Sequence, residues 1–396
     1  MIEKPTYVDL AVIGSGPNGL YAAKQLQLEF PHLSVAIFEQ GPIAASNMAL
    51  YPNVRWHSTM VSLTIPSSLN SVIPSNYAPL SSELANYYQW VALESQIPIF
   101  TNSKVTELVQ SGPELEGNWN LVLESPPSSS WTLAAGTVII ATGIYDNPVP
   151  LPGFGMEMVR RYLDIGITGK RLVLCGGGTS AADAITHLLP SNEIFWILRG
   201  DKPHKVWVEV RPKFESVVSQ YGGNLTMITG TQMTSVVRDT VLLDNGQSIS
   251  GVDEVLALIG FASLSGLVSK SGIRTSNGGL WLSEDFETNL PGVFAFGSIS
   301  SRWDDEKQKI DQSFVENGNP DKFEAILAEI KSQYARDVFV HGFGTDDWRI
   351  LNPEDAPAPL PPSVNALLGL LPKVAMAAYR LRNLLAKFLR RISFRP

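Results

Sequence analysis

The sequence predicts an α/β protein in which one strand, glycine turn, helix and strand unit is followed by a second of the same kind. The first unit spans residues 8–39 and the second spans residues 171–199. The strand that opens each unit is almost wholly apolar, as expected for parallel strands covered by helices on both faces. Two Rossmann-like dinucleotide-binding domains are therefore expected, together with a helical C-terminal tail.

The first turn, at residues 14–19, reads Gly-Ser-Gly-Pro-Asn-Gly and matches G-x-G-x-x-G. Gly14 permits the tight turn, Gly16 lets the backbone approach a pyrophosphate, and Gly19 lets the helix pack closely on the strand. Phosphates are then expected at the helix N-terminus, beside Pro17. Glu39 follows twenty residues after Gly19, where a carboxylate can bind ribose hydroxyls. These features predict an adenine-dinucleotide site; a purely structural turn is the alternative.

The second turn, at residues 176–181, reads Gly-Gly-Gly-Thr-Ser-Ala and matches G-x-G-x-x-A. The strand after it ends in Arg199, and a guanidinium can bind a 2′-phosphate that a carboxylate would repel. Lys202, His204 and Lys205 add positive charge nearby, so NADPH is favoured over NADH. The alternative for Arg199 is an ordinary surface residue. The predicted NADPH contacts are Gly176, Gly178, Thr179, Ser180, Ala181, Arg199 and Lys205.

Two further apolar strands are expected, each ending in glycine. Residues 137–143 end in Ala-Thr-Gly, and residues 291–298 end in Phe-Gly-Ser. Their order along the chain implies that the second unit is inserted in the first. The predicted domains are residues 1–155 with 285–345, residues 156–284, and a linker and tail at 346–396.

The composition of the chain excludes several classes of function. A net charge of −8 argues against nucleic acid as a partner. The single cysteine, Cys175, cannot form an internal disulfide and suits a reducing compartment, so a cytoplasmic location is expected. The five histidines show no metal-ligand spacing, so no metal site is predicted. A strand that begins by residue 7 and the lack of a long apolar run predict neither signal peptide nor spanning helix.

Taken together, the two glycine turns and the two glycine-ended strands resemble those of flavoproteins with two dinucleotide-binding domains. This superfamily includes thioredoxin reductases, class B flavin monooxygenases and bacillithiol-disulfide-reductase-like proteins, and the resemblance covers roughly residues 6–335. It implies FAD in the first unit and NADPH in the second. The FAD contacts that it implies, beyond the first turn and Glu39, are Thr142, Gly143, Gly297 and Ser298.

The chain departs from this superfamily at positions that carry chemistry. It has no C-x-x-C pair, and Asn18 stands where the bacillithiol branch carries a cysteine. The segment 154–162 lacks the histidine of the F-x-G-x-x-x-H pattern common in flavin monooxygenases, and Ser298 replaces a frequent aspartate. Dithiol chemistry by the protein itself is therefore not expected.

The resemblance implies hydride transfer from NADPH to the flavin N5, with the protein positioning the two cofactors. The leading interpretation is a single-component monooxygenase that uses O2, forms a C4a-oxygen flavin adduct and oxygenates a small lipophilic substrate. One alternative is a reductase of a quinone, a low-molecular-weight disulfide or a protein; another is a redox-sensing flavoprotein with little turnover. The candidate catalytic residues follow Glu39, and loop packing is the alternative role for each: Tyr51, Asn53, Trp56 and His57.

The C-terminal tail is basic in an otherwise acidic chain. Residues 356–362 form a Pro-rich linker, and residues 373–392 have the spacing of an amphipathic helix. From residue 356 onward there are seven Lys or Arg and no Asp or Glu. Such a helix can lie on an anionic membrane surface, giving peripheral contact at its inner face. The alternative is a helix docked on the acidic body of the protein or covering the flavin cleft. The oligomeric state stays open.

Overall fold

The computed structural model describes residues 4–44, 55–56, 58–111, 118–125, 129–144, 159–160, 166–204, 206–208, 210–261, 266–276, 279–300, 302–304, 309–311 and 320–340. By its internal contacts the chain divides into two compact parts, residues 1–336 and 337–396, and nearly all described residues belong to the first part. The two dinucleotide-binding units both lie in this first part. None of the described helices is both long and apolar enough to cross a lipid bilayer.

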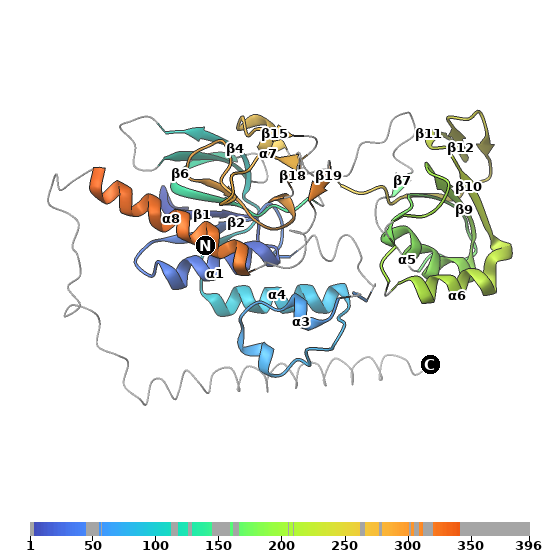
Figure 1. The fold of residues 1–396 in the computed structure, drawn as a ribbon, viewed down its shortest axis with the longest axis horizontal. Coiled ribbons are helices and arrows are strands. Elements are labelled where there is room, and N and C mark those ends of the chain that lie inside the picture. The colour runs from blue at the N-terminus through green and yellow to red at the C-terminus, as the bar shows by residue number, and fades with distance from the viewer. Residues whose placement is uncertain are drawn as a thin grey trace. The chain divides into compact units, whose positions relative to one another are not determined.

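The first sheet has the strand order β3-β2-β1-β6-β5-β4, with β17 paired to β6. Strands β1, β2, β4 and β6 are labelled in Figure 1. Strand β1 runs parallel to both of its neighbours, and Val12 pairs with Ile37 on one side and Ile139 on the other. Strand β5 is antiparallel to both of its neighbours, β4 and β6. Their bounds are β1 (Tyr7–Ile13), β2 (Val35–Phe38), β3 (Ile99–Phe100), β4 (Lys104–Gln110), β5 (Trp119–Ser125), β6 (Ser129–Ile140) and β17 (Val293–Ala295).

Helices and short elements complete this first part of the fold. Helix α1 (Pro17–Glu29) follows β1, and α4 (Ser81–Ser95) precedes β3. Buried aromatic residues pack the end of β17 against helix α8 (Pro320–Val340): the ring centroids of Phe296 and Phe323 are 4.8 Å apart. The remaining elements are α3 (Met60–Leu63), η1 (Ser68–Ser71), α7 (Gly266–Lys270), β15 (Thr275–Ser276), β16 (Gly279–Leu280), η5 (Gly297–Ser300), β18 (Arg302–Asp304), β19 (Lys309–Asp311) and α8 (Pro320–Val340).

The second sheet has the order β10-β9-β8-β14-β7, and all of its strands are parallel. Its strands lie in sequence between β6 and β17 of the first sheet, so the prediction of an inserted second unit is confirmed. The bounds are β7 (Val159–Arg160), β8 (Arg171–Cys175), α5 (Thr179–Leu188), η3 (Leu189–Ser191), β9 (Glu193–Leu198), α6 (Arg211–Tyr221), η4 (Gly222–Asn224), β10 (Leu225–Thr229) and β14 (Glu254–Ala257).

A three-stranded antiparallel sheet is attached to the second unit, formed by β11 (Met233–Val237), β12 (Thr240–Leu243) and β13 (Ser248–Ile249). The turn Asp244-Asn245-Gly246 joins β12 to β13, and Gly246 has a φ of 84°. This turn agrees with the hairpin that its Asn-Gly pair predicts.

The chain returns to the first core earlier than the predicted residue 285. Leu267 and Val268 of α7, together with Ile273 and Leu280, are buried in the same apolar cluster as strands β1 and β6. The amide N–H of Leu108 in β4 also donates to Ser271 Oγ at 2.9 Å. Apolar composition alone does not indicate which of two cores a short helix joins, and the side chains here fill the first.

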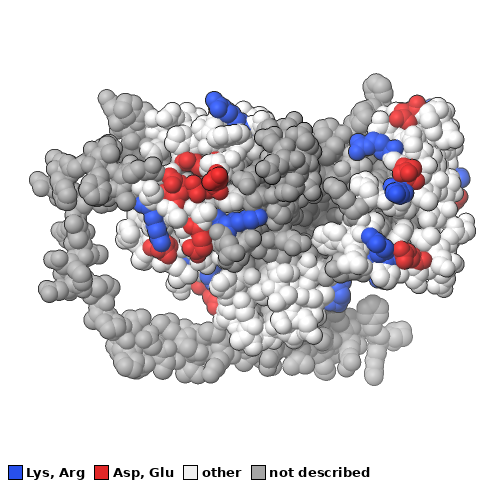
Figure 2. All heavy atoms as spheres, in the orientation of Figure 1, with Lys and Arg blue, Asp and Glu red and all other residues white. Residues whose placement is uncertain are grey.

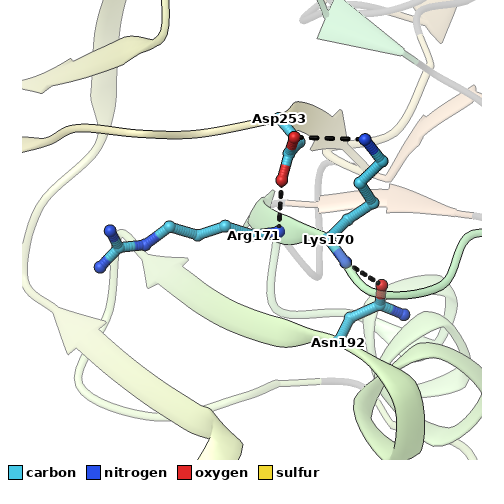
Figure 3. Close-up of polar contacts among 4 residues, drawn as sticks. All are labelled: Lys170, Arg171, Asn192 and Asp253. Atoms are coloured by element: carbon cyan, nitrogen blue, oxygen red, sulfur yellow. Dashed lines mark hydrogen bonds and ion pairs between the residues drawn. The ribbon is translucent and has the colours of Figure 1, made fainter.

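Polar contacts join the starts of three strands in the second sheet (Figure 3). The buried Asn192 accepts from the amide N–H of Lys170 at 2.9 Å. Asp253 accepts from the amide N–H of Arg171 at 2.8 Å and lies 3.2 Å from Lys170 Nζ. The Arg171 amide, and then the Lys170 ammonium, lower the pKa of the Asp253 carboxyl. This carboxylate therefore holds β8 and β14 in register at their N-terminal ends.

Figure 2 shows acidic and basic side chains lying among one another on the face in view. Exposed ion pairs of the described chain include Lys331 with Glu29 and Arg171 with Glu193. Pairs of this kind contribute little to stability, because water screens them.

Asp253→Asn is expected to lower the melting temperature at pH 7, because the neutral amide loses both charge-assisted contacts. The folded pKa of Asp253 lies below its unfolded value, so this contribution is present at neutral pH and is lost on acidification. The difference between variant and unmutated protein should shrink as the pH falls below about 4, measured by thermal unfolding. Asp239→Asn is the control, since that carboxylate accepts within its own turn from the Thr240 hydroxyl. An equal loss at pH 7 and pH 3 would contradict the assignment.

Candidate functional site

The first glycine turn leaves no room for side chains at two of its glycines. Gly14 has a φ of 104°, and a Cβ added there would lie 2.6 Å from the carbonyl oxygen of Ala141. A Cβ at Gly19 would lie only 1.9 Å from the carbonyl oxygen of Gly14. Strand β1, the turn and helix α1 are thus in direct backbone contact, which fixes the direction of the helix axis.

The middle glycine of this turn, Gly16, faces open space. A Cβ at Gly16 would have no heavy atom within 4 Å, and the same holds at Gly178 in the second turn. Both glycines are the N-cap residues of their helices, α1 and α5. The first turns of these helices lie wholly within the described residues, and they contain neither a capping side chain nor an acidic residue. The N–H groups of both helix starts are therefore directed at spaces suited to an anion. This arrangement fits one dinucleotide pyrophosphate at each turn.

Glu39 is held at the first turn by hydrogen bonds. Its Oε2 accepts from both the amide N–H and the hydroxyl of Ser15 at 2.8 Å, and its Oε1 accepts from the Gly41 N–H at 2.9 Å. Ser15 is fully buried. A carboxylate has about four lone-pair positions, so capacity for a ribose hydroxyl is left. Ser15 was missed in the sequence because it occupies a variable position of the motif.

Strand β17 brings a second glycine to the start of α1. Gly297 has a φ of 80°, and a Cβ there would lie 2.5 Å from Cγ of Asn18. The predicted FAD contacts Gly297 and Ser298 thus lie beside the first turn of α1. Thr142 and Gly143 follow the backbone of Ala141 that contacts Gly14. The structure brings both predicted segments together at the carboxyl ends of the strands, as expected for α/β sheets.

The second turn repeats this construction. Gly176 has a φ of 128°, and its Cβ would lie 2.3 Å from the carbonyl oxygen of Leu258. The indole N–H of Trp196 donates to the Gly176 carbonyl at 2.6 Å. Thr179 and Ser180 open α5, and Ala181 is fully buried beneath it. Arg199 follows β9 directly and is exposed, so it is accessible to a 2′-phosphate.

The candidate catalytic residues are only partly described. Tyr51, Asn53 and His57 lie outside the described residues, as do Lys205 and the whole segment 346–396. The indole N–H of Trp56 donates to Ser81 Oγ at 2.9 Å, and its ring packs on the first core. These contacts favour the loop-packing role for Trp56.

Buried tyrosines of α4 hold the loop that follows Trp56. The Tyr87 hydroxyl accepts from the N–H of Ile65 at 2.9 Å and donates to the carbonyl oxygen of the same residue at 2.7 Å. Burial is the main cause that raises the pKa of Tyr87 to about 12. The Tyr88 hydroxyl, also buried, donates to Leu63 O at 3.0 Å. The described part of this loop is therefore a fixed feature of the first unit.

Gly16→Ala is expected to weaken FAD binding by about tenfold or more while leaving the fold intact, because the methyl group enters the space of the pyrophosphate and touches no protein atom. Gly178→Ala should leave FAD bound and weaken NADP+ binding by a similar factor. Flavin content and calorimetric titration measure the two effects. Gly223→Ala is the control, because its Cβ also meets nothing within 4 Å. A Gly16→Ala protein that binds FAD normally would contradict this placement.

Arg199→Glu is expected to raise the KM for NADPH by about 10- to 100-fold and to leave the KM for NADH nearly unchanged. The new carboxylate would repel the 2′-phosphate, which NADH lacks. Steady-state oxidation of each nucleotide, with ferricyanide as the acceptor, measures both constants. Lys213→Glu on α6 makes the same change of charge at another exposed position. Equal effects on the two nucleotides would show that Arg199 does not contact the 2′-phosphate.

Comparison with known proteins places this geometry in a family. The family model for pyridine nucleotide-disulphide oxidoreductases matches residues 11–297. A ferredoxin–NADP reductase of Salinispora tropica is 26% identical over 316 residues, which cover 74% of this chain and 86% of that protein.

Solved structures share the fold. Bacillithiol disulfide reductase from Bacillus cereus superposes with a TM-score of 0.71 at 24% identity, covering 83% of this chain and 99% of that one. Ornithine N-hydroxylase from Kutzneria superposes with a TM-score of 0.64 at 15% identity, covering 83% and 100%. The family match and the relatedness by sequence to ferredoxin–NADP reductases confirm the resemblance to two-domain flavoproteins, with FAD and NADPH as the cofactors. The chain belongs to the pyridine nucleotide-disulphide oxidoreductase family.

Proposed function

We propose that this protein is an NADPH-dependent flavoprotein reductase, which passes electrons from its bound FAD to an external acceptor without using a thiol of its own. The observation that carries this proposal is the burial of its single cysteine within a strand. Cys175 is 6% exposed and lies in β8, paired with Ala257 and Ile197 of the neighbouring strands. A dithiol relay needs two cysteines that can reach each other and the flavin, and this chain supplies neither condition.

The residue at the first turn supports the same proposal. Asn18 occupies the position where the bacillithiol branch carries a cysteine, and its side chain lies against Gly297. An amide side chain cannot accept or release electrons. Electrons that reach the flavin therefore leave it for a molecule that the protein binds, and not for one of its own residues.

The chain's residues bind and orient the cofactors. The N-terminus of α1 would hold the FAD pyrophosphate, and Glu39, fixed by Ser15, would bind the ribose. The N-terminus of α5 would hold the NADPH pyrophosphate, and Arg199 would select the 2′-phosphate. When bound, the flavin accepts a hydride and can pass electrons onward singly or in pairs.

The proposed acceptor is a small one-electron redox protein of the ferredoxin type. The support is the relatedness by sequence to ferredoxin–NADP reductases, which extends over 86% of the length of the Salinispora tropica protein. A quinone is an alternative acceptor of the same reductase. The monooxygenase interpretation is a second candidate, because the lack of a thiol suits it equally. The ornithine N-hydroxylase supports this second candidate only through its similar fold.

The decisive experiment offers NADPH and one acceptor at a time to the FAD-loaded full chain. Anaerobic assays would use a bacterial ferredoxin coupled to cytochrome c, a soluble quinone, and glutathione disulfide. Aerobic assays would follow oxygen and peroxide with a lipophilic amine, sulfide or ketone present. The reductase proposal expects rapid reduction of ferredoxin without oxygen. Slow reduction of every anaerobic acceptor, combined with incorporation of oxygen into an added substrate, would replace it with the monooxygenase.

Cys175→Ala is expected to leave acceptor-dependent kcat unchanged within about twofold, because the thiol takes no part in electron transfer. The lost sulfur should cost about 1 kcal/mol of stability, measured by urea unfolding. Val173→Ala in the same strand is the matched control for the loss of buried volume, since Val173 is fully buried. A large loss of turnover in the cysteine variant alone, at normal flavin content, would contradict the proposal.

A further inference from the structure

The segment between β9 and α6 is bonded to the second glycine turn. We define the strap as residues 199–208, all of which are described except residue 205. The amide N–H of His204 donates to the carbonyl oxygen of Gly177 at 2.7 Å, and the amide N–H of Trp207 donates to Thr179 Oγ1 at 3.0 Å. The strap is thus anchored to both the turn and the first residue of α5.

The side chain of His204 lies against the middle glycine of the turn. A Cβ added to Gly177 would be 2.9 Å from His204 Nδ1 and 3.2 Å from its Cε1. Position 177 is a variable position of G-x-G-x-x-A, so the motif itself does not require glycine there. The imidazole accounts for it, because any side chain at position 177 would have to displace the ring.

The next residue, Gly178, faces the open space at the N-terminus of α5. The imidazole of His204 thus lies against Gly177, one residue before the N-cap that faces the space assigned to the NADPH pyrophosphate. A phosphate oxygen accepts hydrogen bonds from imidazole N–H groups as it does from the free N–H groups of a helix start.

We propose that His204 is a pyrophosphate ligand of the nicotinamide cofactor, carried to the glycine turn by the strap. Its role differs from that of Arg199, which lies at the end of β9 and serves the 2′-phosphate. His204 strengthens the binding of any nicotinamide dinucleotide, whereas Arg199 discriminates between two of them. This contact does not depend on which acceptor the flavin serves.

The test is calorimetric titration of the FAD-loaded full chain with NADP+ and, separately, with NAD+. His204→Ala should raise the Kd of both nucleotides by about tenfold, the typical effect of losing one hydrogen bond to a charged group. The ratio of the two Kd values should stay unchanged, because both nucleotides carry the pyrophosphate. His187→Ala is the matched control, since His187 lies at the other end of α5, 3.5 Å from Asp183; it should change neither Kd.

An unchanged Kd in His204→Ala would overturn the proposal, and so would a loss confined to NADP+, which would move the contact to the 2′-phosphate. Failure of the unmutated protein to bind either nucleotide would overturn it together with the cofactor assignment. A ferredoxin assay that fails while both titrations succeed would affect only the proposed acceptor.

A second measurement does not depend on affinity. The chain has five histidines, so the imidazole carbon–proton signal of His204 can be assigned by its absence from the spectrum of His204→Ala. Addition of NADP+ or NAD+ should shift this signal in the unmutated protein and leave the His187 signal in place. A His204 signal that stays unmoved at saturating nucleotide would exclude the contact.

Discussion

The fold of both units depends on a contact between backbone atoms in which no side chain fits. At the first turn, Gly19 lies so close to the carbonyl of Gly14 that a Cβ would be 1.9 Å from its oxygen. At the second, a Cβ at Gly176 would be 2.3 Å from the carbonyl oxygen of Leu258, the residue that follows β14. The first contact sets the angle at which α1 leaves β1, and the second holds the turn before α5 against the end of a neighbouring strand. Glu39, Gly297 and Arg199 take their places relative to helix starts that are already fixed.

The glycine spacing made much of this predictable. Two glycine turns, each between an apolar strand and a helix, sufficed for the α/β class. The two glycine-ended strands added the insertion of the second unit and the resemblance that implies both cofactors. The hairpin at Asp244-Asn245-Gly246 was predictable for a similar reason, since few residues adopt a positive φ without strain. In each case one local conformation demands one residue type, which makes the pattern specific.

Features set by packing between distant segments were not predictable in the same way. The return to the first core by α7 depends on Leu267 and Val268 filling a space beside β4, and nothing in their local sequence shows it. Ser15 and Gly177 occupy variable motif positions, so their contacts with Glu39 and His204 carry no signature. The sequence does not separate reductase from monooxygenase for a different reason, because a missing thiol is common to both.

The hydrogen bonds of Glu39 make the two nucleotide sites unequal in how readily they could change. The carboxylate proposed to bind the first ribose also accepts from the amide groups of Ser15 and Gly41, so it is part of the turn itself. Its replacement would leave a buried serine and a backbone donor without their acceptor, at a cost to folding itself. Arg199, by contrast, is exposed at the end of β9, and no hydrogen bond of the described turn depends on it. Over evolutionary time, the preference between NADPH and NADH is therefore free to drift by single substitutions, whereas the identity of the first cofactor is tied to the integrity of the fold.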